Sequence, residues 1–177
     1  MQQQQQQQRP AVLSSFAWQV QPQSAGKTML VICNMQTLFP EASDKTLLDR
    51  VCSLIDQAIA NNWAIAVLEW ADYGETLERV RQRLARYGNY FTVTTHADDG
   101  SGALLDYCHE HGLSAKLYVV CGVSINACVR RTVRGLAYSY GQPMVDVITS
   151  ACGDHYAPRW DQFPEATQIR LLPSLGH

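Results

Sequence analysis

The sequence has no excess of positive charge, and it carries little charge of either sign. Its 177 residues include 14 Lys and Arg against 16 Asp and Glu, and charged residues make up only 17% of the chain. A protein that grips the phosphate backbone of a nucleic acid needs a concentrated basic surface. The composition therefore predicts no nucleic-acid partner.

Long apolar runs are also missing. The longest runs are about as long as a β-strand, well short of the roughly 20 residues that a membrane-spanning helix needs. The N-terminal residues do not show a cationic segment followed by an apolar core, which is the pattern of a secretory signal. We therefore expect a cytoplasmic protein with no membrane partner.

The placement of the six cysteines argues against disulfide bonds and against a metal site. His109 and His111 are two residues apart and point to different sides of a helix, and no further Cys or His pair with zinc spacing accompanies them. We expect neither a metal nor a cofactor. Free cysteine behaves as a small hydrophobic residue, and five cysteines lie in or beside apolar runs: Cys33, Cys52, Cys108, Cys121 and Cys152.

What the sequence does contain is a regular alternation of apolar runs and amphipathic segments. Continuous apolar runs such as residues 29–33 are typical of parallel strands covered on both faces. Six strands that alternate with helices predict an α/β fold: one doubly wound, mainly parallel sheet with helices on both faces, in a Rossmann-like three-layer sandwich. The strands are expected over residues 29–33, 64–68, 90–95, 117–121, 144–149 and 168–172. The helices are expected over 44–61, 76–87, 102–111 and 126–140.

The chain length suits one core, which we expect to lie within a single domain over residues 27–177. Residues 1–26 begin with a glutamine tract from Gln2 to Gln8. Such a tract has nothing to bury and is expected to be a disordered extension that leads into the domain. A neutral extension and an interaction tail both remain open as interpretations.

One cysteine lies where such a fold places its chemistry. Open α/β sheets bind ligands at the carboxyl ends of their strands, and Cys128 falls just after the strand over 117–121, in the first turn of a helix that begins near Asn126. Unpaired N–H groups in that turn favour a thiolate, so we expect a lowered thiol pKa. The same groups could stabilise an oxyanion. The alternative is a buried structural cysteine.

Two motifs resemble those of the isochorismatase-like cysteine hydrolases. Val31-Ile-Cys-Asn-Met-Gln-Thr-Leu-Phe39 resembles the first-strand motif of that family, usually Val-Ile-Asp-Met-Gln followed by a phenylalanine. Cys121-Gly-Val-Ser-Ile-Asn-Ala-Cys-Val129 resembles the family motif Gly-Val-x-Thr-x-x-Cys-Val. The resemblance extends over residues 27–172, nearly the whole of the expected domain.

This resemblance implies a hydrolase of a small amide, carbamoyl or related substrate, with Cys128 as nucleophile. Family members pair the cysteine with an aspartate as general base and a lysine as electrostatic support, and they usually form dimers or larger homo-oligomers. A cis peptide near Val123-Ser124, together with Asn126, would shape the oxyanion hole. The residues expected to line the substrate pocket are Gln36, Phe39, Trp70 and Tyr73, although core or interface packing is an equal alternative for the last two.

The other two catalytic positions depart from the family. Asn34 stands where the family has its aspartate and cannot accept a proton at neutral pH, and Thr95 stands where the family has its lysine. His96 and Glu69 are candidates for a replacement base. The alternatives are an exposed loop histidine for His96 and a structural or surface carboxylate for Glu69.

Two functions therefore remain open from the sequence. The first is a hydrolase that acts through Cys128 with an unusual base. The second is a catalytically inactive homologue that keeps the fold as a ligand-binding or oligomeric scaffold. Arg130, Arg131 and Arg134, which follow Cys128, could hold an anionic substrate, form ion pairs between subunits, or simply be solvated.

Overall fold

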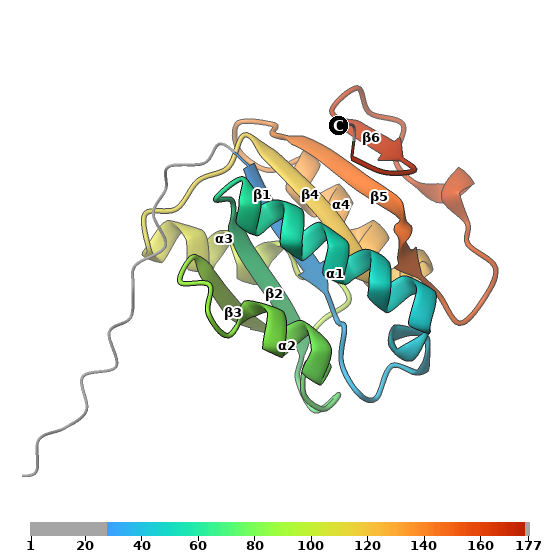
Figure 1. The fold of residues 1–177 in the computed structure, drawn as a ribbon. Coiled ribbons are helices and arrows are strands. Elements are labelled where there is room, and N and C mark those ends of the chain that lie inside the picture. The colour runs from blue at the N-terminus through green and yellow to red at the C-terminus, as the bar shows by residue number, and fades with distance from the viewer. Residues whose placement is uncertain (1–27, 176–177) are drawn as a thin grey trace, which may run out of the picture.

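The computed structural model describes residues 28–175, and its centre is a six-stranded sheet (Figure 1). Every neighbouring pair is parallel, in the order β3-β2-β1-β4-β5-β6. The doubly wound α/β architecture expected from the sequence is confirmed. The extension expected over residues 1–26 lies outside the described residues. The strands are β1 (Thr28–Cys33), β2 (Ala64–Trp70), β3 (Tyr90–Thr95), β4 (Leu117–Val123), β5 (Met144–Gly153) and β6 (Ile169–Leu172).

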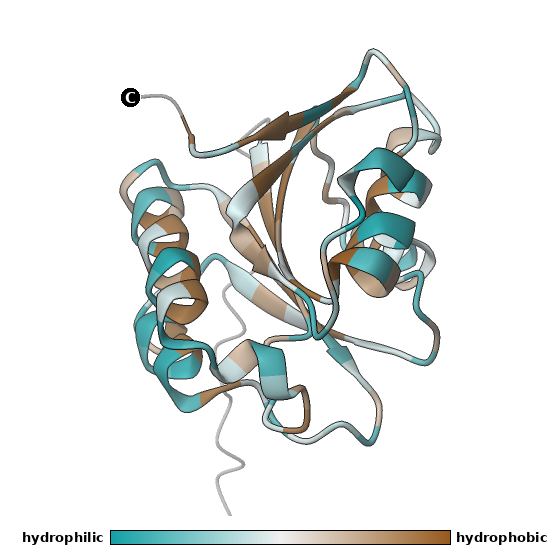
Figure 2. Cartoon of the chain, turned by 90° about the vertical axis from the view of Figure 1, so that its right-hand side faces the viewer, coloured by the Kyte–Doolittle hydropathy of each residue, from teal (hydrophilic) through white to brown (hydrophobic). Residues whose placement is uncertain are grey.

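Helices cover both faces of the sheet, as Figures 1 and 2 show. Helices α1 (Lys45–Ala60) and α2 (Glu78–Leu84) pack on one face, and α3 (Ser101–Glu110) and α4 (Arg130–Ala137) pack on the other. Short turns complete the chain: η1 (Pro40–Ser43), η2 (Ile125–Val129) and η3 (Trp160–Gln162). In Figure 2 the strands are mainly hydrophobic, and the helices turn their hydrophilic sides away from them. No helix within residues 28–175 is long and apolar enough to span a membrane.

Strand β1 shows why the sequence contains continuous apolar runs. Leu30 and Ile32 belong to the core under α1 and α2, whereas Met29, Val31 and Cys33 belong to the core under α3 and α4. None of these five side chains is more than 1% exposed. Successive residues of a strand point to opposite faces, so a strand covered on both sides must be apolar throughout.

Several element boundaries differ from those expected. Helix α1 begins after Asp44 rather than at it, and the Asp44 side chain caps the helix by accepting a hydrogen bond from the Leu47 N–H at 2.8 Å. Strand β5 continues past Thr149 because the register shifts beyond Val120 of β4 and lets the last residues of both strands pair. Because residues 149–150 are polar, the hydrophobic pattern of the sequence does not predict that the strand continues through them.

Candidate functional site

Cys128 lies at the carboxyl end of the sheet, next to the point where the strand order reverses. Strand β1 is central, with β2 on one side and β4 on the other, and a ligand site is expected at such a switch point. The chain leaves β4 at Val123 and turns through η2, whose π-helical turn carries Cys128. The Cys128 side chain is almost completely enclosed, with the residue only 3% exposed.

The expectation of a lowered thiol pKa at Cys128 is wrong, because burial raises it. The loss of water around the thiolate is the largest effect, and the charge of the nearby Asp98 carboxylate raises the pKa further. Opposing effects come from the backbone N–H groups of Ser124 and Cys128 and from the side chain of Asn34, which stabilise the thiolate. Desolvation of a charged group outweighs these donors. The thiol is therefore protonated at neutral pH.

Asn34, the residue directly after strand β1, approaches Cys128. It is 4% exposed and adopts a left-handed backbone conformation, with φ of 49°, and its N–H donates to the carbonyl of Leu68 at 2.9 Å. Its side chain reaches the Cys128 thiol, while its Oδ1 atom is buried and has no hydrogen-bond partner among residues 28–175. An unpaired buried acceptor is costly, so this oxygen is suited to receive a donor from a ligand.

The loop after β3 supplies Asp98 to this site. Asp98 forms an ion pair with Arg131 of α4, and its charge acts on the Cys128 thiol. Thr95, at the end of β3, is buried, and its hydroxyl donates to the carbonyl of Glu69 at 3.4 Å. Sequence reasoning did not select Asp98, although an acidic residue just after a strand was the available signal.

Neither candidate base forms a hydrogen bond to Cys128 within residues 28–175. Glu69 points to the side of the sheet that α2 covers, where its carboxylate accepts hydrogen bonds from the Thr76 hydroxyl at 2.5 Å and the Thr76 N–H at 3.2 Å. Glu69 lies two residues after Val67, so strand alternation places both on the same face, away from α4. His96 is exposed, and its side chain forms no hydrogen bond within the described part of the chain.

The residues expected to line the pocket contact one another and the surrounding backbone. Gln36 is 0% exposed, and its Nε2 donates to the carbonyls of Trp70 and Gly74 at 3.0 and 2.7 Å, while its Oε1 accepts from the Trp70 N–H at 2.8 Å. Phe39 stacks on Tyr73, which also contacts Trp70. Gln36 thus ties the loop after β1 to the loop after β2.

The turn that carries Cys128 is fixed by two carboxylates. The Val123-Ser124 peptide bond is cis, as the resemblance implies, and the Ser124 hydroxyl donates to Glu41 at 2.5 Å. The Asn126 N–H donates to Asp154 at 2.7 Å. The Asn126 side chain holds the C-terminal segment: its Nδ2 donates to the Ala157 carbonyl and its Oδ1 accepts from the Arg159 N–H. A hollow of about 510 Å³ lies beside this turn, lined by both carboxylates.

No protein-family model and no curated protein matches the sequence. Solved structures do match. N-carbamoylsarcosine amidase from Thermoplasma acidophilum aligns with a TM-score of 0.66 and 17% identity, over 82% of this chain and 95% of its own. A crystal structure described as an isochorismatase family protein aligns with a TM-score of 0.62 and 13% identity, over 82% and 98%.

The chain has the isochorismatase-like fold. A third match is YcaC from Escherichia coli, described as an octameric hydrolase of unknown specificity, with a TM-score of 0.63 and 16% identity over 83% of this chain and 76% of its own. At these identities the likeness establishes the fold alone. Within the isochorismatase-like fold, the site around Cys128 must therefore be interpreted from its own chemistry.

Proposed function

We propose that the protein hydrolyses a small amide, carbamoyl or related compound through Cys128. The observation that carries this proposal is the set of donors around the sulfur. The backbone N–H groups of Ser124 and Cys128 and the side chain of Asn34 all stabilise negative charge there. Such donors favour the thiolate, which is the form of cysteine that acts as a nucleophile. The solved structures with this fold include an amidase and a hydrolase.

The proposed chemistry begins with a protonated thiol. The Cys128 sulfur attacks the substrate carbonyl carbon, and the thiol proton passes to the Asp98 carboxylate. The same proton then goes to the leaving nitrogen as the carbon–nitrogen bond breaks, which leaves a thioester. Water hydrolyses the thioester and restores the thiol. We assign the general base to Asp98, whose charge acts on the thiol, because Asn34 has no basic atom at neutral pH.

The test is hydrolysis of a panel of small amides, ureas and carbamoyl compounds, followed by ammonia or amine release. We expect Cys128→Ala to abolish turnover. Asp98→Asn is expected to lower kcat by about 10²- to 10⁴-fold, the usual contribution of a general base. Glu69→Gln is the matched control, because its carboxylate faces the other side of the sheet and should leave kcat unchanged. Turnover that survives Cys128→Ala would overturn the proposal.

A second function is favoured by one specific observation. Asn34 cannot accept a proton, and the Cys128 pKa is raised, which suits a ligand-binding scaffold without catalysis. Asn34→Asp distinguishes the two, because it returns a carboxylate to the thiol. Turnover that appears only in this variant would identify the natural chain as the scaffold. Turnover in the natural chain would exclude the scaffold.

We also propose that the chain forms homo-oligomers, for which the octameric YcaC structure is the support. Analytical ultracentrifugation of the full chain measures this directly. A sedimentation coefficient that corresponds to 19.8 kDa at all concentrations would contradict it.

A further inference from the structure

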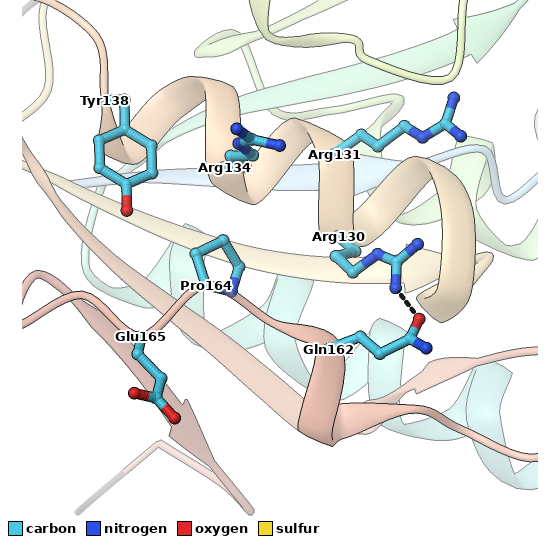
Figure 3. A pocket seen from close by; sticks show the side chains of 7 residues that line it. All are labelled: Arg130, Arg131, Arg134, Tyr138, Gln162, Pro164 and Glu165. Atoms are coloured by element: carbon cyan, nitrogen blue, oxygen red, sulfur yellow. Dashed lines mark hydrogen bonds between the residues drawn. The ribbon is translucent and has the colours of Figure 1, made fainter.

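Helix α4 presents three arginines on the side that faces away from the core. Arg130, Arg131 and Arg134 lie within five consecutive residues, while the remaining side of the helix is buried. A hollow of about 420 Å³ opens beside them (Figure 3). Its other lining residues are Tyr138, Gln162, Pro164 and Glu165. The volume lies within the range of small-molecule sites.

The charges in this hollow are incompletely neutralised. Arg131 is paired with Asp98, whereas Arg130 donates to the neutral side-chain carbonyl of Gln162 and acts on the Asp161 carboxylate only through longer-range charge within the described residues. Within residues 28–175, neither Arg130 nor Arg134 forms an ion pair. Glu165 lines the same hollow, yet Figure 3 shows its carboxylate turned away from the helix.

The spacing places Arg130 and Arg134 on the same face of α4, and both line the hollow. Arg130 and Arg134 are four residues apart, and side chains at this spacing lie next to each other on a helix, where like charges repel. An anion between them would relieve this repulsion. The next position at the same spacing is Tyr138, which is 56% exposed and whose hydroxyl points toward the hollow in Figure 3. Three donors thus follow one line along α4.

We propose that this hollow binds a small molecule that bears a phosphate or carboxylate group. Arg130 and Arg134 hold the oxyanion, because the planar guanidinium fork matches two oxygens of such a group. Tyr138 donates a further hydrogen bond. This proposal does not rest on the proposed hydrolase function.

Isothermal titration calorimetry on the full chain tests the proposal. Inorganic phosphate and succinate are titrated separately at constant ionic strength, with chloride as the comparison anion. We expect saturable one-site binding of phosphate, succinate or both, and no binding of chloride. The probe that binds more tightly shows whether the site prefers a phosphate or a carboxylate group. Equal binding of chloride, or no saturable binding of either probe, would overturn the proposal.

Two double variants test the residues. Arg130→Gln with Arg134→Gln is expected to weaken binding at least about 100-fold, or about tenfold for each charge-assisted contact. Arg130→Lys with Arg134→Lys keeps the charge and removes the fork, so a loss of about tenfold is expected. Arg79→Gln is the matched control, since Arg79 is a half-exposed arginine on α2 paired with Asp49. Unchanged affinity in the glutamine double variant, with the fold intact by circular dichroism, would refute the site.

Discussion

Gly122→Ala is expected to destabilise the fold strongly. Gly122 pairs with Cys33 across β1 and β4 and adopts φ of +115°, which side chains rarely tolerate. A Cβ atom at this position would lie 2.1 Å from the Cys33 carbonyl oxygen and 2.8 Å from the Cys33 nitrogen. These neighbours are backbone atoms in the centre of the sheet, so they cannot move aside as a flexible side chain could.

The magnitude follows from two contributions. A non-glycine residue in an unfavourable backbone conformation costs about 1–3 kcal/mol, and overpacking a well-packed core costs about 1–3 kcal/mol. Together they predict a loss of about 2–6 kcal/mol. Since domains are stable by about 5–15 kcal/mol, this is a large share of the total.

Urea unfolding followed by circular dichroism measures the change. Gly102→Ala is the matched control, because Gly102 lies in helix α3 and a Cβ there meets nothing within 4 Å. Alanine in a helix is better than glycine by about 0.5–1 kcal/mol, so this variant should be slightly more stable. If the unfolding free energy of Gly122→Ala differs from that of the natural chain by less than about 1 kcal/mol, which is about the uncertainty of the comparison, the reasoning is refuted.

Three further predictions concern buried polar groups. Gln36→Met is expected to cost about 2–4 kcal/mol in urea unfolding, because it leaves the backbone groups of two loops unpaired, while exposed Gln82→Met should change nothing measurable. Arg170→Met leaves buried Asp146 without its cation. Because Arg170 is half exposed, we expect the unfolding free energy to fall by about 2 kcal/mol, less than for a fully buried pair. A fall of less than about 0.5 kcal/mol would contradict this prediction. Stability should also fall as the pH rises above 9.0, since folding raises thiol pKa values and the folded state holds those protons longer. Burial raises the pKa of Cys108 to about 11 and that of Cys152 to about 12, and it also raises the thiol pKa values of Cys33, Cys52, Cys121 and Cys128. Measuring the unfolding free energy at about pH 8 and about pH 10.5 checks this prediction. Equal values at the two pH values would contradict it.

The architecture could be predicted from the sequence because burial leaves a local pattern. Strand β1 is enclosed on both faces, so its residues are apolar without interruption, and helix α1 buries one stripe of regularly spaced apolar residues. Strand β5 escaped full recognition, because its continuation past Thr149 depends on a register shift opposite β4. Such a shift is a relation between two strands and leaves no trace in either one.

The site could be predicted only in part. The motif around Cys128 and its helix-forming continuation place the thiol at the sheet edge from sequence alone. The direction of its pKa shift could not be predicted, because it is set by how completely other segments enclose the sulfur. The part played by Asp98 was also hidden, since it depends on where the loop after β3 folds back. Glu69 was a reasonable candidate by position, but alternation along β2 turns its carboxylate to the other face.

The ion pair between Asp98 and Arg131 joins two regions of the molecule. At one end, the charge of Asp98 raises the pKa of the Cys128 thiol, and at the other, Arg131 lines the hollow on the outer side of α4. An anion that draws Arg131 away from Asp98 leaves that carboxylate less neutralised, and the thiol then holds its proton more tightly. Linkage makes this effect reciprocal. If the proposed anion acts in this way, ionisation of Cys128 weakens the anion's affinity by the same factor by which the anion suppresses ionisation, and this one ion pair would couple the two sites.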